Sequence, residues 1–164
     1  MTCDLERDLE RLLKWWDALP REGDGLPHYS HIDFFNLKAW LGDLGIVTFE
    51  AETSRYRVRL AGTNFRDIDK GDSTGKYLDE IIPGACSTAV LAPYERCRAV
   101  KRPVADRIQL TDRPHMKIER LLLPFGPDLA RILVGMVRTD REIDMVKASQ
   151  AVLEERATVE LFEI

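Results

Sequence analysis

Strict alternation of apolar and polar side chains in two neighbouring runs, residues 47–52 and 55–60, is the feature that most constrains the fold of this chain. The apolar positions are Val47, Phe49 and Ala51 in the first half, and Tyr56, Val58 and Leu60 in the second. A period of two residues is that of a half-buried β-strand, whose successive side chains point to opposite faces. The segment therefore predicts an antiparallel hairpin with one apolar face and one charged face.

The charged face of this hairpin carries a stripe of arginines, Arg55, Arg57 and Arg59. A two-residue turn would pair Glu50 with Arg57 and Phe49 with Val58, whereas a longer loop would shift that register. Nucleic-acid binding would favour aromatic side chains between the arginines, but glutamates occupy the facing strand, and the chain has a net charge of −4. We therefore expect a solvated, salt-bridged face and no nucleic-acid partner.

The rest of the chain predicts an α+β fold with five strands. Further strands are expected at about residues 103–111, 116–125 and 130–138. Helices are expected at about 33–42, 86–101 and 142–156, and the tail from 157 is ambiguous between a strand and a helix end. Pro93 lies inside the second of these helices and should kink or divide it.

Residues 4–19 form an amphipathic pattern, with Asp4 as a fair N-cap and Pro20 ending the helix. The strands at 116–138 are apolar on both faces, so one face needs a cover beyond the inserted helices. We expect this helix to lie across that face and a second copy of the chain to complete the burial as a twofold dimer. The candidate interface residues are Leu5, Leu9, Leu12, Trp16, Leu19, Leu133 and Val137. The predicted organisation is a helix at 1–20, a domain at 21–140 and a tail at 141–164.

Three stretches, "WW…LP", "YRVRLAGTNF" and "GDSTGKYLDEI", resemble the stand-alone bacterial PAS-like family formerly described as a domain of unknown function. The resemblance covers about residues 10–140 and implies a five-stranded antiparallel sheet with inserted helices around a small pocket. It also implies a free-standing sensor or dimerisation module. In the loop, we expect Gly62 to adopt a positive φ, Gly75 to permit a tight approach, and Asp72, Ser73 and Thr74 to cap backbone N–H groups.

The expected function is that of a cytoplasmic sensor or adaptor in bacterial signalling that binds a small hydrophobic molecule, a signalling protein, or both. The candidate pocket residues, which plain core packing would explain equally well, are Trp40, Phe49, Tyr56, Val58, Leu60, Tyr77, Leu91 and Tyr94. The identity of any cofactor stays open. One alternative is an interaction module with a filled core, and a less favoured one is a small α+β enzyme.

No catalytic motif is apparent, so we expect no enzymatic activity. His28, His31 and Asp33 have a spacing that could bind a metal ion, but solvated histidines with Asp33 as an N-cap are favoured, and His115 fits a turn. Cys3, Cys86 and Cys97 are expected to be reduced thiols. No run reaches the roughly 18 apolar residues of a membrane span, and the charged N-terminus does not resemble a signal peptide.

Overall fold

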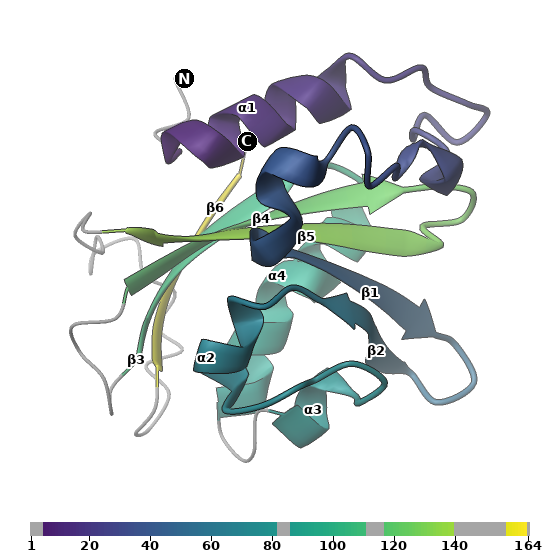
Figure 1. Ribbon diagram of the computed structural model, residues 1–164. Coiled ribbons are helices and arrows are strands. Elements are labelled where there is room, and N and C mark those ends of the chain that lie inside the picture. The colour runs from purple at the N-terminus through teal and green to yellow at the C-terminus, as the bar shows by residue number, and fades with distance from the viewer. Residues whose placement is uncertain (1–4, 82–85, 111–116, 140–156, 164) are drawn as a thin grey trace.

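The computed structural model describes residues 5–81, 86–110, 117–139 and 157–163 of the 164-residue chain. Its centre is a six-stranded antiparallel sheet with strand order β2-β1-β5-β4-β3-β6. The strands are β1 Leu44–Glu50, β2 Arg55–Ala61, β3 Val104–Leu110, β4 Lys117–Phe125, β5 Arg131–Thr139 and β6 Ala157–Glu163. The predicted five-stranded α+β fold is thus confirmed, and the ambiguous tail adds a sixth strand beside β3 (Figure 1).

The helices lie before the sheet and between its second and third strands. The α-helices are α1 Arg7–Asp17, α2 Phe65–Asp69, α3 Leu78–Ile81 and α4 Cys86–Val100, and the 3-10 helices are η1 Tyr29–His31 and η2 Lys38–Asp43. Three predicted details are corrected. The first helix begins at Arg7 with Glu6 as its N-cap, and the helix expected at 33–42 is a turn followed by η2. Of the two effects expected of Pro93, division of the helix is wrong, because α4 runs through this residue as one helix. The helix expected at 142–156 lies outside the described residues.

The β1–β2 hairpin has a different register from the predicted one. Phe49 pairs with Tyr56 and Glu50 pairs with Arg55, because the chain turns over residues 51–54 instead of over two residues. The observed pairing is shifted by two positions, and an even shift keeps every side chain on the face that alternation assigns to it. The partners were therefore predicted wrongly, although the faces were predicted correctly.

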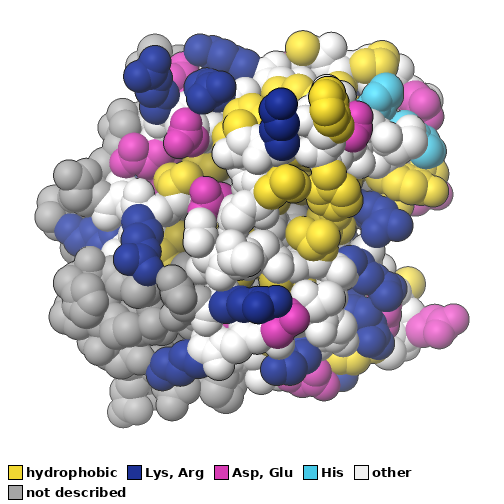
Figure 2. Space-filling view, viewed as in Figure 1, with side chains coloured by type: hydrophobic (Ala, Val, Ile, Leu, Met, Phe, Trp, Pro, Cys, Tyr) yellow, Lys and Arg dark blue, Asp and Glu magenta, His cyan; other side chains and the backbone are white. Residues whose placement is uncertain are grey.

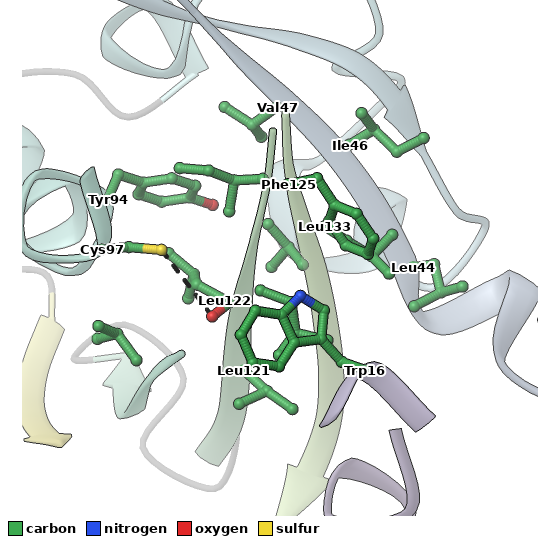
Figure 3. Packing of buried hydrophobic residues seen from close by; sticks show 14 of the residues in the cluster. Trp16, Leu44, Ile46, Val47, Tyr94, Cys97, Leu121, Leu122, Phe125 and Leu133 are labelled. Atoms are coloured by element: carbon green, nitrogen blue, oxygen red, sulfur yellow. Dashed lines mark hydrogen bonds between the residues drawn. The ribbon is translucent and has the colours of Figure 1, made fainter. Parts of the chain in front are cut away.

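The sheet is covered on both faces (Figures 1 and 3). On one face, Trp16 of α1 donates a hydrogen bond from its indole to the carbonyl of Pro124 at 3.0 Å. A Cβ at Gly135 would lie 2.6 Å from a methyl carbon of Leu12, so the glycine allows the helix to approach the strand closely. On the other face, Tyr94 and Cys97 of α4 pack against β4 (Figure 3). The prediction that the N-terminal helix lies across the outer face is confirmed, and one apolar core includes side chains from both sides of the sheet.

Gly62 and Gly75 have the opposite roles from those expected. Gly62 does not have a positive φ, but a Cβ there would lie 2.4 Å from the carbonyl oxygen of Gly42. Gly75 has a φ of +86° and open space around it. The first glycine is therefore required for close approach of the backbone, and the second for its left-handed conformation. Asp72 caps the backbone N–H of Thr74 at 2.9 Å, as predicted.

Candidate functional site

Strands β3 and β4 carry two buried ion pairs at consecutive register positions. Asp106 lies opposite Arg120, and Arg107 lies opposite Glu119. The closest N–O distances are 2.5 Å for Arg120–Asp106 and 2.7 Å for Arg107–Glu119. Since adjacent residues of a strand point to opposite faces, one pair faces α4 and the other faces α1. Each face of the sheet therefore contains one buried ion pair. On one face β3 supplies the carboxylate and β4 the arginine, and on the other face these roles are exchanged.

The pair on the α4 face is held in a fixed geometry. Arg120 donates two hydrogen bonds to the carboxylate of Asp106, at 2.8 and 2.5 Å. Burial alone would lower the pKa of Arg120, but the attraction of Asp106 outweighs it, so the pKa is raised and the guanidinium stays charged. Its carbon Cζ lies 5.6 Å from the centroid of the Tyr94 ring.

Tyr94 is the unusual member of this region. Its side chain points from α4 toward the sheet (Figure 3), and the residue is only 3% exposed. Burial raises the pKa of its hydroxyl to about 12, so the hydroxyl is a neutral hydrogen-bond donor at physiological pH. Among the described residues, this hydroxyl has no hydrogen-bond partner, although buried polar groups usually have one.

The C-terminal end of α2 contributes a further carboxylate, that of Asp69. Burial raises the pKa of Asp69, while a hydrogen bond from the buried Ser73 lowers it. The Asp69 carboxylate acts electrostatically on both Arg120 and Tyr94. We call Asp69, Ser73, Tyr94, Asp106 and Arg120 the interior polar cluster. Sequence reasoning had selected only Tyr94 from this set as a site residue.

Aromatic side chains border the interior polar cluster on the hairpin side. The rings of Phe49 and Tyr56 have centroids 5.0 Å apart, and those of Tyr56 and Tyr94 are 5.6 Å apart. Arg98 donates a hydrogen bond to the Tyr56 hydroxyl at 3.2 Å, and burial raises the pKa of that tyrosine. The buried Val58 also belongs to this core. Tyr56, Val58 and Tyr94 are therefore buried in this one core and Phe49 is half-buried against it. Phe49, Tyr56 and Tyr94 form an unbroken series of ring contacts.

The other predicted pocket residues lie elsewhere. Tyr77 bridges to Arg57 at the edge of β2 and donates a hydrogen bond to Glu50 at 2.7 Å, on the charged face of the hairpin. Trp40 lies against α1, where its indole donates to the carbonyl of Asp8 at 3.1 Å. Leu60 and Leu91 are half-buried against the core.

The arginine stripe is salt-bridged, as the sequence indicated. Glu50 accepts hydrogen bonds from Arg57 at 2.6 Å and from Arg59 at 3.2 Å. The bonds from Arg57 and Tyr77 lower the pKa of Glu50. Arg55 instead pairs with Asp79 and Glu80, at 2.7 and 3.2 Å. These charges largely neutralise one another on the outer face of the hairpin.

The pair on the α1 face fastens the N-terminal helix to the sheet. Glu119 accepts a hydrogen bond from Arg107 at 2.7 Å and another from the backbone N–H of Glu6 at 2.5 Å. The hydroxyl of Thr139 donates to the side chain of Glu6 at 2.5 Å. This anchor was not predicted, although the Asp106–Arg107 dipeptide in one expected strand and Glu119–Arg120 in the next contained the signal.

The candidate dimer residues are largely covered within a single chain. Those that are buried are Leu5, Leu9, Leu12, Trp16 and Leu133. Leu19 and Val137 are only half-buried. The residues that the structure describes do not reveal a partner, so the dimer stays a prediction.

The histidine-containing loop is organised by local hydrogen bonds. His28 Nδ1 accepts from the backbone N–H of Ser30 at 3.1 Å, and Asp33 caps the backbone N–H of Phe35 at 2.8 Å. The described part of the chain contains no group of three or more His, Cys, Asp or Glu side chains that could hold a metal ion. Likewise, none of its helices is both long and apolar enough to cross a membrane. Cys3 and His115 lie outside the described residues.

Comparison with known proteins agrees with this architecture. A family model described as a PAS domain matches residues 6–137, which include α1 to α4 and nearly all of β1 to β5. No curated protein and no solved structure matches the chain. Because the match covers well over half of the sequence and the strand order agrees with the expected fold, the chain belongs to the PAS domain family.

Proposed function

We propose that this chain is a cytoplasmic sensor or adaptor in bacterial signalling, in which the interior polar cluster binds a small molecule. PAS domains in general are sensor and signalling modules, and the family match supports this role. The observation that carries the proposal is the Tyr94 hydroxyl, which is 3% exposed and has no hydrogen-bond partner among the described residues. A buried donor without a partner costs about 1–3 kcal/mol, so a ligand that accepts its hydrogen bond would stabilise the fold.

The surroundings of Tyr94 define the class of molecule. Phe49 and Tyr56 offer aromatic faces, and the charge of Arg120 is already neutralised by Asp106. A net anion would therefore gain little from Arg120. The proposed ligand is a small, uncharged, largely hydrophobic molecule with a carbonyl or similar acceptor that meets the Tyr94 hydroxyl.

The proposed output is a change in the position of α1. Arg120 lies beside Tyr94 on the α4 face of the sheet. The adjacent residue of β4, Glu119, points to the opposite face and accepts a hydrogen bond from the backbone N–H of Glu6. A ligand that prefers one arrangement of β4 would shift the population of the anchored helix in proportion to its differential affinity. No catalytic step is part of this mechanism.

A second candidate function is an adaptor that binds proteins and has a filled core. The exposed aromatic side chains of residues 29–41 favour it. A homodimer is compatible with either function. In both cases, the partner can reach Leu19 and Val137 without moving α1, whereas the buried candidates become available only if α1 is displaced.

Native mass spectrometry of freshly purified protein tests the sensor proposal. We expect extra mass on the native chain and a reduced adduct on Tyr94→Phe, which removes only the buried hydroxyl. Tyr56→Phe is the matched control, because its hydroxyl already accepts from Arg98, and this variant should keep the adduct. Absence of any adduct on all three proteins would contradict ligand binding and leave the adaptor function.

A further inference from the structure

The exposed large hydrophobic residues of the described chain are concentrated in one segment. Tyr29, Phe34, Phe35 and Leu41 are 38%, 42%, 74% and 41% exposed, and all lie within residues 29–41. Figure 2 shows hydrophobic side chains gathered over η2, with Lys or Arg side chains beside them and histidines at the edge. We call these four residues, with the half-buried Trp40, the aromatic surface.

The segment that carries the aromatic surface is firmly attached to the domain. Leu37 is fully buried, and the backbone N–H of Tyr29 donates to the carbonyl of Gly126 at 2.9 Å. Asp33 caps the turn that contains Phe35, and Trp40 is hydrogen-bonded to α1. The aromatic side chains are therefore displayed from a fixed backbone, which lowers the entropy that a partner must remove on binding.

Three cations lie on the rings of this surface. Lys38 Nζ is 5.2 Å from the ring centroid of Phe35, and Arg131 Cζ is 5.0 Å from that of Tyr29. Arg11 Cζ lies 5.6 Å from the Trp40 ring, but it also pairs with Asp8 at 3.5 Å. Within the described ranges, Lys38 and Arg131 have no carboxylate partner.

The nearby carboxylates are engaged in local structure. Asp33 accepts from Phe35 and Asn36, and Asp43 accepts from Asn64 at 2.6 Å. Asp8 faces Arg11. Lys38 and Arg131 can therefore pair with carboxylates of another molecule. They form a local basic edge although the chain as a whole has a net charge of −4.

We infer that the aromatic surface is a docking site for an acidic amphipathic segment of a partner protein. Apolar side chains of that segment cover Phe34, Phe35 and Leu41, and its carboxylates pair with Lys38 and Arg131. The surface comes from one short segment, whereas a stable interface between globular chains uses about 20–30 residues on each side. A peptide-sized occupant therefore fits better than a second copy of the chain.

This inference gives the adaptor part of the proposed function a surface and a partner class, and it does not depend on an interior ligand. The two proposals can fail separately. The interior ligand is tested by the extra mass that native mass spectrometry detects, and the docking site is tested by peptide binding.

The test uses the full chain and a fluorophore-labelled helical peptide of about five turns, with leucines along one face and glutamates on the other. Fluorescence anisotropy measures its binding, and chemical-shift changes locate the site. The control peptides carry the same residues without a leucine face, or lysines in place of the glutamates. We expect binding of the acidic amphipathic peptide alone, with shifts confined to residues 29–41 and their neighbours.

Variants distinguish this site from general charge attraction. Phe35→Ala should weaken binding about 10-fold, because an exposed aromatic anchor is lost, and Lys38→Glu should weaken it at least about 5-fold. Lys14→Glu makes the same charge change on the exposed face of α1 and should alter binding by less than about 2-fold. Circular dichroism should show all three variants folded.

Three results would overturn the inference. The first is no binding by the unmodified chain, or equal binding of the control peptides. The second is equal weakening by Lys14→Glu and Lys38→Glu. The third is a concentration-dependent dimer that Phe35→Ala abolishes, which would make a second copy the occupant.

Discussion

The carboxylate of Glu119 in β4 lies 2.5 Å from the backbone nitrogen of Glu6, a residue 113 positions earlier in the chain. The same carboxylate is bonded to Arg107 at 2.7 Å, and Glu119 is fully buried. A negative charge next to the N-terminus of α1 also interacts favourably with the helix dipole. One side chain thus satisfies a buried cation and fixes the start of the helix that covers the sheet.

Glu119→Gln should reduce the free energy of unfolding by about 3 kcal/mol, because it leaves Arg107 buried without its counter-charge. Hydrogen exchange at the backbone amides of α1 should accelerate at the same time. Urea unfolding measures the first effect. Glu10→Gln, on the exposed face of α1, is the control and should change stability by less than about 0.5 kcal/mol. A loss of stability without faster exchange in α1 would argue against the anchoring role.

The ion pair on the other face of the sheet, Asp106–Arg120, predicts that exchanging its two charges restores part of the stability lost when one of them is removed. Asp106→Asn should destabilise the fold by about 3–5 kcal/mol, since Arg120 would remain charged and buried. The double variant Asp106→Arg with Arg120→Asp restores opposite charges at one register position, so it should recover part of that loss. Thermal unfolding of Asp106→Arg, Arg120→Asp and the double variant checks the coupling. Simple additivity of the two single losses would contradict a direct interaction between these residues.

The alternation pattern predicted the strands but could not determine their partners. Loops of two and four residues place Phe49 on the same face, so the pattern did not distinguish pairing with Val58 from the observed pairing with Tyr56. The buried ion pairs required the register of β3 and β4, which depends on the connection between them. Asp106–Arg107 and Glu119–Arg120 both run from acidic to basic, so antiparallel pairing sets opposite charges across from each other, and this would have indicated that register.

The candidate site was predicted in part for similar reasons. Tyr56 and Tyr94 meet because the apolar face of β2 and the inner side of α4 were both identified from periodicity. Tyr77 was expected in the pocket, but its side chain lies on the charged face of the hairpin. Its position follows from the bridge between Tyr77 and Arg57, which no local sequence pattern reveals. Trp40 was assigned to the periodicity of an α-helix, whereas it lies in a 3-10 helix and faces α1.

The glycines of the loop should respond differently to substitution. Gly62→Ala should destabilise the fold by several kcal/mol, about 3 or more, because its Cβ would lie 2.4 Å from a backbone oxygen of Gly42. Gly75→Ala should cost about 1–2 kcal/mol, since φ is +86° there but space is open. Gly23→Ala, with neither constraint, is the control. Chemical denaturation gives the order, and a larger loss at Gly75 than at Gly62 would contradict these roles.

The predicted homodimer can be tested with residues that remain accessible. Leu19→Glu and Val137→Glu change half-buried positions next to α1, and both should weaken any dimer that uses this side of the molecule. Sedimentation over a range of concentrations measures the association. Deleting residues 1–20 is not a clean test, because it would expose Leu133 and the rest of the face that α1 covers. A chain that stays monomeric at high micromolar concentration would refute the dimer.

Stability should fall in alkaline solution because of Cys97 and Tyr94. Burial raises the pKa of both groups to about 12, from 9.0 for the thiol and 10.0 for the phenol. The folded chain therefore keeps these protons after the unfolded chain has released them, so their contribution is fully present below pH 9 and is lost between about pH 9 and 12.

Urea midpoints measured from pH 8 to 11 should show this fall, which amounts to a few kcal/mol, on the order of 3. Cys97→Ala should be less stable at pH 8, because it leaves a cavity under Leu122, but its stability should depend less on pH above 9. The native thiol should also resist alkylation at pH 8, where it is protonated and buried. An unchanged pH slope in Cys97→Ala would exclude this thiol as the source, because the remaining ionisable groups are the same in both proteins.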